Sequence, residues 1–197
     1  DNLLVLPRIP RPDAGSARFR PVTRLVTAHS QLEGAGFTVR RPFPGEVPEI
    51  ESDPVLLLDH VGPLEWGPRE AKGAPWHPHR GFETVSYIID GAVEHHDSTG
   101  GGGLITSGAM QWMTAGAGIL HDEVPPEDVF NGGGLFHGAQ LWVNLPARLK
   151  ATPPRYQDIE PSQIKMLSSE DGSTLIRVIA GELAGYEGPA TTWTPIT

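Results

Sequence analysis

Glycine and proline interrupt this sequence so often that few helices of ordinary length can form. The 197 residues include 24 glycines and 20 prolines, and the apolar runs between them are short. Proline breaks helices because it lacks a backbone N–H, and glycine supplies the positive φ of tight turns. Short apolar runs bounded by these residues are typical of β-strands. We therefore expect an all-β fold, namely a sandwich, a jelly roll or a small barrel.

The strand pattern is clearest at residues 84–89. Val85, Tyr87 and Ile89 alternate with their neighbours, so they share one face of an extended chain, as in a half-buried strand. Prolines interrupt residues 1–33, which we expect to form an extended arm, and short helical turns are expected near 148–154 and 161–167. The expected strands are residues 37–41, 55–59, 84–89, 118–121, 140–144 and 174–180.

Charge and composition exclude several classes of function. The chain has 24 acidic and 15 basic residues and a net charge of -9, which disfavours binding to nucleic acid or to an anionic membrane surface. It has no cysteine, so disulfides, thiolate nucleophiles and cysteine metal sites are excluded. The sequence shows neither an apolar stretch of membrane-spanning length nor the layout of a signal peptide, and we expect a cytoplasmic protein.

Two short motifs carry the metal-binding chemistry. His77-Pro78-His79 and His121-Asp122-Glu123 each place two ligand residues at i and i+2, on the same face of a strand. Three imidazoles and one carboxylate suit Fe, Mn, Ni, Cu or Zn. The alternative is that each motif is a turn containing histidine, but the glycines beside both motifs favour a compact site.

The remaining candidates have simpler interpretations. His95 and His96 are expected at a hairpin end, and His60 and His137 are expected to be structural. Three large residues, Trp112, Met113 and Trp142, are expected in the core, with the walls of an apolar pocket as a second role for the tryptophans. Gln140 and Asn144 fit either polar groups of a cavity or loop anchors.

Four sequence blocks, in order, resemble the signature blocks of the pirin family of the cupin superfamily. They are HPHRGFETVSY at 77–87, QWMTAG at 111–116, GILHDE at 118–123 and LWVNL at 141–145. Weaker similarity extends from GFTVRR at 36–41 and LLLD at 56–59 to AGE at 180–182 and TP at 194–195, and the arm before Gly34 is not covered.

The resemblance implies a cupin-type double-stranded β-helix, which is a jelly-roll barrel. Pirins are bicupins, so we expect an arm at 1–33, a metal-binding barrel at 34–150, and at 151–197 a linker with the start of a second, incomplete barrel. The expected first strand of that second barrel is 191–197. An incomplete barrel would expose a strand edge, so we expect either a dimer or retention of the rest of the barrel as a separate piece produced by cleavage.

The resemblance also implies that His77, His79, His121 and Glu123 bind the metal, which is usually iron(II) in pirins. Glu83 completes the general cupin motif His-x-His-x3-Glu, so it is the alternative carboxylate ligand. Parity counted along one continuous strand would put Glu83 on the same face as His77, where it could instead orient a ligand imidazole. Asp122 is expected to point to the opposite face.

Two functions follow from the resemblance. The first is a quercetin 2,3-dioxygenase, in which Glu123 accepts the proton of a flavonol hydroxyl group and a tryptophan lines the ring pocket. The second is a non-catalytic regulator that senses redox state through its iron and binds a transcription factor or a metabolic enzyme. Oxygen consumption with a flavonol would distinguish them.

Overall fold

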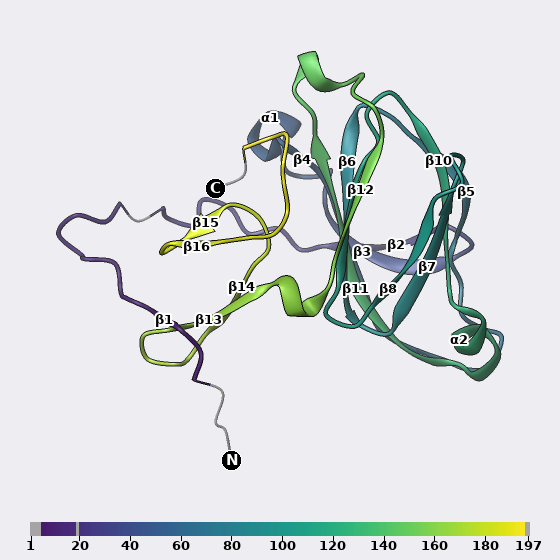
Figure 1. Cartoon of the computed structure of the whole chain (residues 1–197), viewed down its shortest axis with the longest axis horizontal. Coiled ribbons are helices and arrows are strands. Elements are labelled where there is room, and N and C mark those ends of the chain that lie inside the picture. The colour runs from purple at the N-terminus through teal and green to yellow at the C-terminus, as the bar shows by residue number, and fades with distance from the viewer. Residues whose placement is uncertain (1–4, 19, 196–197) are drawn as a thin grey trace. The chain divides into compact units, whose positions relative to one another are not determined.

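The structure, a computed structural model, describes residues 5–18 and 20–195 and confirms the all-β class (Figure 1). The chain divides into two units. The first, called the body here, is Val26–Pro161, and the second, called the terminal unit, consists of the described parts of Asp1–Leu25 and Ser162–Thr197. Within the described residues, no helix has the length and apolar character needed to cross a membrane.

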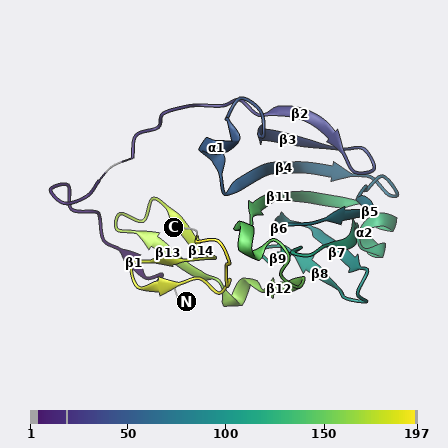
Figure 2. The ribbon, with the colours of Figure 1, turned by 90° about the horizontal axis from the view of Figure 1, so that it is seen from above.

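The body consists of two β-sheets (Figure 2). The strand order is β12-β9-β6-β11-β4-β3-β2 in the large sheet and β5-β10-β7-β8 in the small sheet. Two short helices, α1 (Glu49–Ser52) and α2 (Glu127–Gly132), and the 3-10 turn η1 (Ala147–Leu149) lie between strands. The strands are β2 (His29–Glu33), β3 (Phe37–Phe43), β4 (Val55–Trp66), β5 (Ala74–His79), β6 (Phe82–Asp90), β7 (Ala92–Asp97), β8 (Gly102–Thr106), β9 (Met110–Thr114), β10 (Ile119–Val124), β11 (Gly134–Asn144) and β12 (Arg155–Ile159).

Apolar side chains between the sheets form the core of the body. Ile88 and Phe136 of the large sheet pack against Ile105 of the small sheet. A second cluster joins Met113 of β9 to Ile119 of β10. These contacts hold β6, β9 and β11 opposite β8 and β10, so side chains on the inner faces of the two sheets meet.

The expected strands overlap β3, β4, β6, β10, β11 and β14. Several strands were not expected, and two of them, β1 and β2, lie in the segment expected to be an extended arm. The helical turn expected at 161–167 covers only η2 (Pro161–Gln163), and strand β13 follows it at once. The turn expected at 148–154 overlaps η1.

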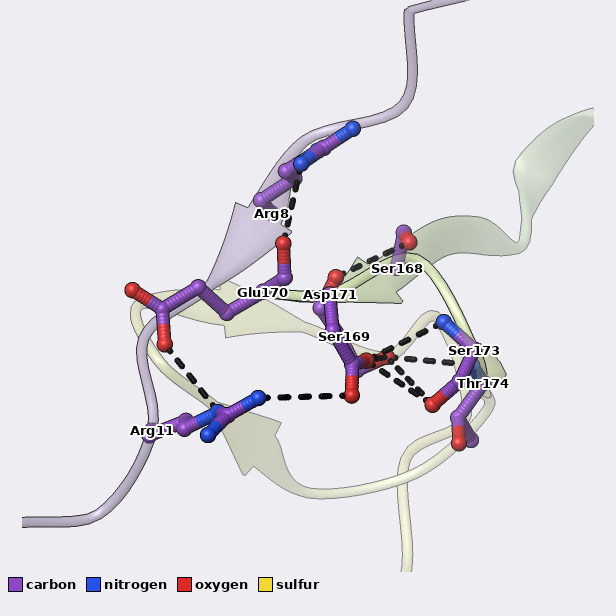
Figure 3. Close-up of polar contacts among 8 residues, drawn as sticks. All are labelled: Arg8, Arg11, Ser168, Ser169, Glu170, Asp171, Ser173 and Thr174. Carbon is purple, nitrogen blue, oxygen red and sulfur yellow. Dashed lines mark hydrogen bonds and ion pairs between the residues drawn. The ribbon is translucent and has the colours of Figure 1, made fainter.

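The terminal unit joins segments from both ends of the sequence. Its strand β1 (Arg8–Ile9) pairs in parallel with β13 (Lys165–Ser169), which pairs with β14 (Leu175–Val178). Arg8 donates a 2.9 Å hydrogen bond to the carbonyl oxygen of Glu170, and Arg11 lies 3.4 Å from the Glu170 carboxylate (Figure 3). Two further strands, β15 (Glu182–Leu183) and β16 (Tyr186–Glu187), form a small hairpin.

The strand expected at 191–197 is not formed over 191–195, and residues 196–197 lie outside the described part. Ala190 forms an isolated bridge with Ala180, and the chain then bends before Pro195. Because proline cannot donate a ladder hydrogen bond, it is a poor residue for a paired strand.

Candidate metal centre

Three histidine side chains converge between β5 and β10. His77 and His79 lie two residues apart on β5, and His121 of β10 is the direct cross-strand neighbour of His77. One ring nitrogen from each residue lies within 4.8 Å of the other two. The ring centroids are 4.5 Å apart for His77 and His121 and 4.8 Å apart for His79 and His121. The structure thus brings together three of the four predicted ligands.

Tight turns bring the two histidine motifs together. Gly81, with φ of 79°, turns the chain directly after β5, and Gly116, with φ of 50°, lies in the turn before β10. The Gly81 N–H donates a 2.8 Å hydrogen bond to the Gly116 carbonyl oxygen. Residues with a side chain rarely adopt such positive φ values, so the glycines beside the motifs allow this geometry.

Two of the three imidazoles, those of His79 and His121, are buried and have ring nitrogens available to bind a metal. His79 is 5% exposed and His121 is 1% exposed. Burial, together with the charge of neighbouring histidines, lowers the pKa of His79 to about 3 and that of His121 to about 4, so both rings are neutral at pH 7. Among the described residues, Nε2 of His79 and both ring nitrogens of His121 have no hydrogen-bond partner.

The tautomer of His77 follows from its hydrogen bond. Its Nδ1 lies 2.7 Å from the carbonyl oxygen of Pro75. A carbonyl oxygen can only accept, so Nδ1 carries the proton and the Nε2 lone pair remains available. Metal-binding histidines commonly donate their other N–H in this way. Buried, neutral imidazoles with unused nitrogen atoms fit a bound divalent transition metal.

Glu123 lies beside the three imidazoles but does not join their cluster. The pairing of β10 with β5 shifts between His121 and Glu123, which is a β-bulge. The Glu123 carboxylate accepts hydrogen bonds from Gln140 Nε2 at 3.0 and 3.2 Å and from Ser86 Oγ at 3.3 Å. Among the described residues, the cluster of converging ligand atoms contains only the three histidines. The role of Glu123 as fourth ligand therefore stays a prediction.

Glu83 lies in a different environment from the one that strand parity indicated. It belongs to β6, which begins after the turn at Gly81, so parity counted from His77 does not continue to it. Its fully buried carboxylate accepts a 2.6 Å hydrogen bond from Thr114 Oγ1, and burial raises its pKa. Glu83 does not line the cavity beside the histidines, whereas Ser86 on the other face of β6 does.

A cavity of about 640 Å³ opens beside the imidazoles. Its lining is mostly apolar and includes Val39, Val61, Trp66, Phe136 and Trp142, together with His77, His79 and Glu123. The Trp142 ring stacks on Phe82 at a centroid distance of 4.5 Å and meets His79 edge-on at 5.2 Å. This cavity has the size and polarity of a site for a small aromatic molecule.

A cluster of three charged side chains lies on the cavity wall. Arg41 binds Asp59 through two hydrogen bonds, 2.6 Å from Nε and 2.5 Å from Nη2. Nη2 also lies 2.9 Å from the Glu33 carboxylate. The three residues line the cavity, and the paired carboxylates hold the guanidinium group in place.

The structure assigns the tryptophans and the two amides different positions. Trp142 lines the cavity, but Trp112 does not and is buried elsewhere. Gln140 is a cavity group that holds Glu123. Asn144 is a loop anchor, because its side chain donates to Asp53 and accepts from Lys150.

Sequence reasoning missed a polar group that lies behind the candidate centre. His95, expected at a hairpin end, is buried in β7 directly across from Glu123. Its Nε2 contacts the Gln111 amide, which also donates a 2.9 Å hydrogen bond to Asp158. His96 and Asp122 point to the opposite face, where His96 Nδ1 lies 2.9 Å from the carboxylate. The alternation of Val93, His95 and Asp97 is the signal that could have revealed β7.

Comparison with known proteins gives consistent matches. A family model described as Pirin matches residues 36–143. A Pseudomonas aeruginosa protein, PA2418, which carries quercetin 2,3-dioxygenase as a provisional name, is 46% identical over 170 residues, covering 86% of this chain and 59% of the relative. Pirin of Rattus norvegicus is 42% identical, covering 91% of this chain and 57% of that protein.

A solved structure shares the same architecture. The crystal structure of quercetin 2,3-dioxygenase from Acinetobacter baumannii is 43% identical, with a TM-score of 0.77, and the match covers 86% of this chain and 59% of that one. The chain therefore spans less than two thirds of the length of these relatives.

Proposed function

The chain belongs to the pirin family, and on that premise we propose that its body carries the metal centre of a dioxygenase that oxidises a flavonol, as in quercetin 2,3-dioxygenase. The observation that supports this most directly is the cluster of three converging imidazoles, two of them buried, beside a mostly apolar cavity of about 640 Å³. The proposal concerns the role of these residues in the whole protein, because the relatives are longer than this chain.

The proposed ligands are His77, His79, His121 and Glu123. The metal is iron(II), with manganese, nickel, copper and zinc as the alternatives that this donor set also suits. A metal bound here would act as a Lewis acid, lowering the pKa of a coordinated hydroxyl group, and would bring redox chemistry to the cavity. Cysteine is absent from the chain, so imidazole nitrogen and carboxylate oxygen are its strongest donors for such an ion.

The chain's own residues bind and orient the flavonol. Trp142 lines the cavity beside His79 and stacks on Phe82, and a planar aromatic ring can pack against Trp142. Glu123 faces the same cavity and would accept the proton of the flavonol hydroxyl group. Gln140 and Ser86 hold its carboxylate by hydrogen bonds, which fixes the position of the proton acceptor.

The direct test combines metal analysis with oxygen consumption. Protein prepared without oxygen should contain one equivalent of a transition metal, and the metal-loaded protein should consume oxygen when quercetin is added. The double variant His77→Ala/His121→Ala should contain no tightly bound metal and should be inactive. A full equivalent of metal in that variant would contradict the ligand assignment.

Glu123→Ala and Glu83→Gln form a matched pair. Glu123→Ala should reduce metal affinity and abolish oxygen consumption. Glu83→Gln should retain both, because its carboxylate binds Thr114 and does not line the cavity. The reverse order would favour Glu83 as the carboxylate ligand. Metal-loaded protein that consumes no oxygen with any flavonol would contradict the dioxygenase proposal and leave the redox-sensing regulator as the alternative.

A further inference from the structure

A second pair of histidines lies on the face of the large sheet that is turned away from the cavity. His60 of β4 lies between Asp59 and Val61, which both line the cavity, so its side chain points the other way. His137 of β11 likewise follows the cavity-lining Phe136. Neither histidine lines the cavity, so the pair is separate from the candidate metal centre.

The two imidazoles point their Nε2 atoms at each other. These atoms are 2.8 Å apart, and the ring centroids are 5.0 Å apart. Both residues are half-buried, which leaves one side of the pair open to solvent. The strand pairing is irregular beside His137, toward both β4 and β6. Such β-bulges often re-aim a side chain next to a functional site.

We propose that His60 and His137 form a second metal site, specific for a divalent ion with adjacent ligands near 90°, such as Cu²⁺ or Ni²⁺. With metal–nitrogen bonds of about 2.05 Å, a separation of 2.8 Å corresponds to an angle of about 86° at the metal. A tetrahedral ion such as Zn²⁺ would need nitrogen atoms about 3.3 Å apart. Square-planar and tetragonal sites are typical of Cu²⁺ and Ni²⁺.

The charged groups around the pair have opposite effects on metal binding. His137 is the cross-strand neighbour of Asp90, whose carboxylate lies 3.9 Å from His137 Nδ1, the nitrogen that faces away from His60. A carboxylate that accepts a hydrogen bond from the other nitrogen commonly supports a metal-binding imidazole. At 3.9 Å Asp90 lies beyond hydrogen-bond distance and contributes its negative charge. Burial, the charge of Arg40 and His137 itself lower the pKa of His60, which keeps its imidazole neutral. Arg40 is the direct cross-strand neighbour of His60 and donates a hydrogen bond to the Gly62 carbonyl oxygen, and its positive charge acts against a bound cation.

The test measures Cu²⁺ uptake by the whole, tag-free, metal-free chain, using equilibrium dialysis and electron paramagnetic resonance. The wild-type chain should bind two equivalents, one at each site. His60→Gln and His137→Gln should each bind one equivalent, because one imidazole is left to hold the second ion. Asp90→Asn should weaken binding of the second equivalent, because it removes the negative charge 3.9 Å from His137. His29→Gln removes an exposed histidine of β2 and should still bind two.

A reciprocal experiment separates this site from the first. The variant His77→Ala/His121→Ala should keep one Cu²⁺, whose resonance spectrum shows coupling to two nitrogen donors. Circular dichroism should show that every variant is folded. The proposal is overturned if the wild-type chain binds a single Cu²⁺, if either His60→Gln or His137→Gln still binds two, or if the spectrum shows one nitrogen donor. Those results would mean that the pair shares only a hydrogen bond.

Discussion

Acidification from pH 7.5 to pH 5 should destabilise the metal-free protein through two buried imidazoles. The pKa is about 3 for His79 and about 4 for His121 in the folded chain, because both are buried beside other histidines, and 6.5 when unfolded. Below pH 6.5 the unfolded state therefore binds more protons than the folded state. The free energy of unfolding falls as the pH falls, until the pH nears the folded-state values.

The size of this effect follows from the two shifts. Each imidazole costs about 1.4 kcal/mol per pH unit below its unfolded pKa, which gives about 2 kcal/mol each at pH 5 and about 4 kcal/mol for the pair. This is a large part of the 5–15 kcal/mol that stabilises a typical protein. The lowered pKa values of the half-buried His60 and the buried His95 add to the loss, and the raised pKa of the exposed His96 opposes it.

Urea denaturation in the presence of a chelator at pH 7.5, 6.5, 5.5 and 5 measures the loss. His121→Gln should lose about 2 kcal/mol less than the wild-type chain over this range, since glutamine does not titrate. His29→Gln, which alters an exposed histidine, should behave as the wild type does. A flat wild-type profile, or an unchanged loss in His121→Gln, would refute the reasoning.

Three further predictions concern single positions. Gly73→Ala should lower metal affinity at least tenfold in a metal titration, because a Cβ there would overlap the Glu123 backbone. Gly132→Ala is the control, because a Cβ there has open space around it. Equal metal affinities in the two variants would contradict the predicted effect of Gly73→Ala. Met113→Ala should lower the free energy of unfolding by about 2–5 kcal/mol in urea, as its fully buried side chain leaves a cavity, and a loss below 1 kcal/mol would be inconsistent with that packing. Arg11→Ala should change the free energy of unfolding by less than about 1 kcal/mol, because its ion pair with Glu170 is exposed and exposed ion pairs contribute little. A larger loss would contradict this interpretation of the Arg11–Glu170 pair.

The sequence predicted those strands whose side chains alternate between a buried and an exposed face, or whose apolar runs end at clear turns. It failed for β9, because all five residues of that strand are buried and no alternation remains to be seen. The expected strands do not include β5, because Pro75 and Pro78 look like loop residues, although the spacing of His77 and His79 already indicated an extended segment there. That strand lies at the edge of the small sheet, where a missing N–H is tolerated.

The candidate site was predictable as far as it depends on local spacing. His77 and His79 share a face because they are two residues apart on one strand, and His121 meets them through the pairing of β10 with β5. The position of the Glu123 carboxylate was not predictable, because it depends on a bulge and on hydrogen bonds from Gln140 and Ser86, which come from other strands.

The pairing of β1 with β13 has a consequence for how the chain is made. The body is one continuous stretch, Val26–Pro161, but the terminal unit needs residues from before and after it. During synthesis the body can collapse while residues beyond 161 are still inside the ribosome, because domains generally fold as units from the N-terminal side. Strand β1 therefore stays unpaired until β13 has left the ribosome. The order of the segments in the sequence therefore implies that the body folds before the terminal unit, whose segments precede and follow it in the chain.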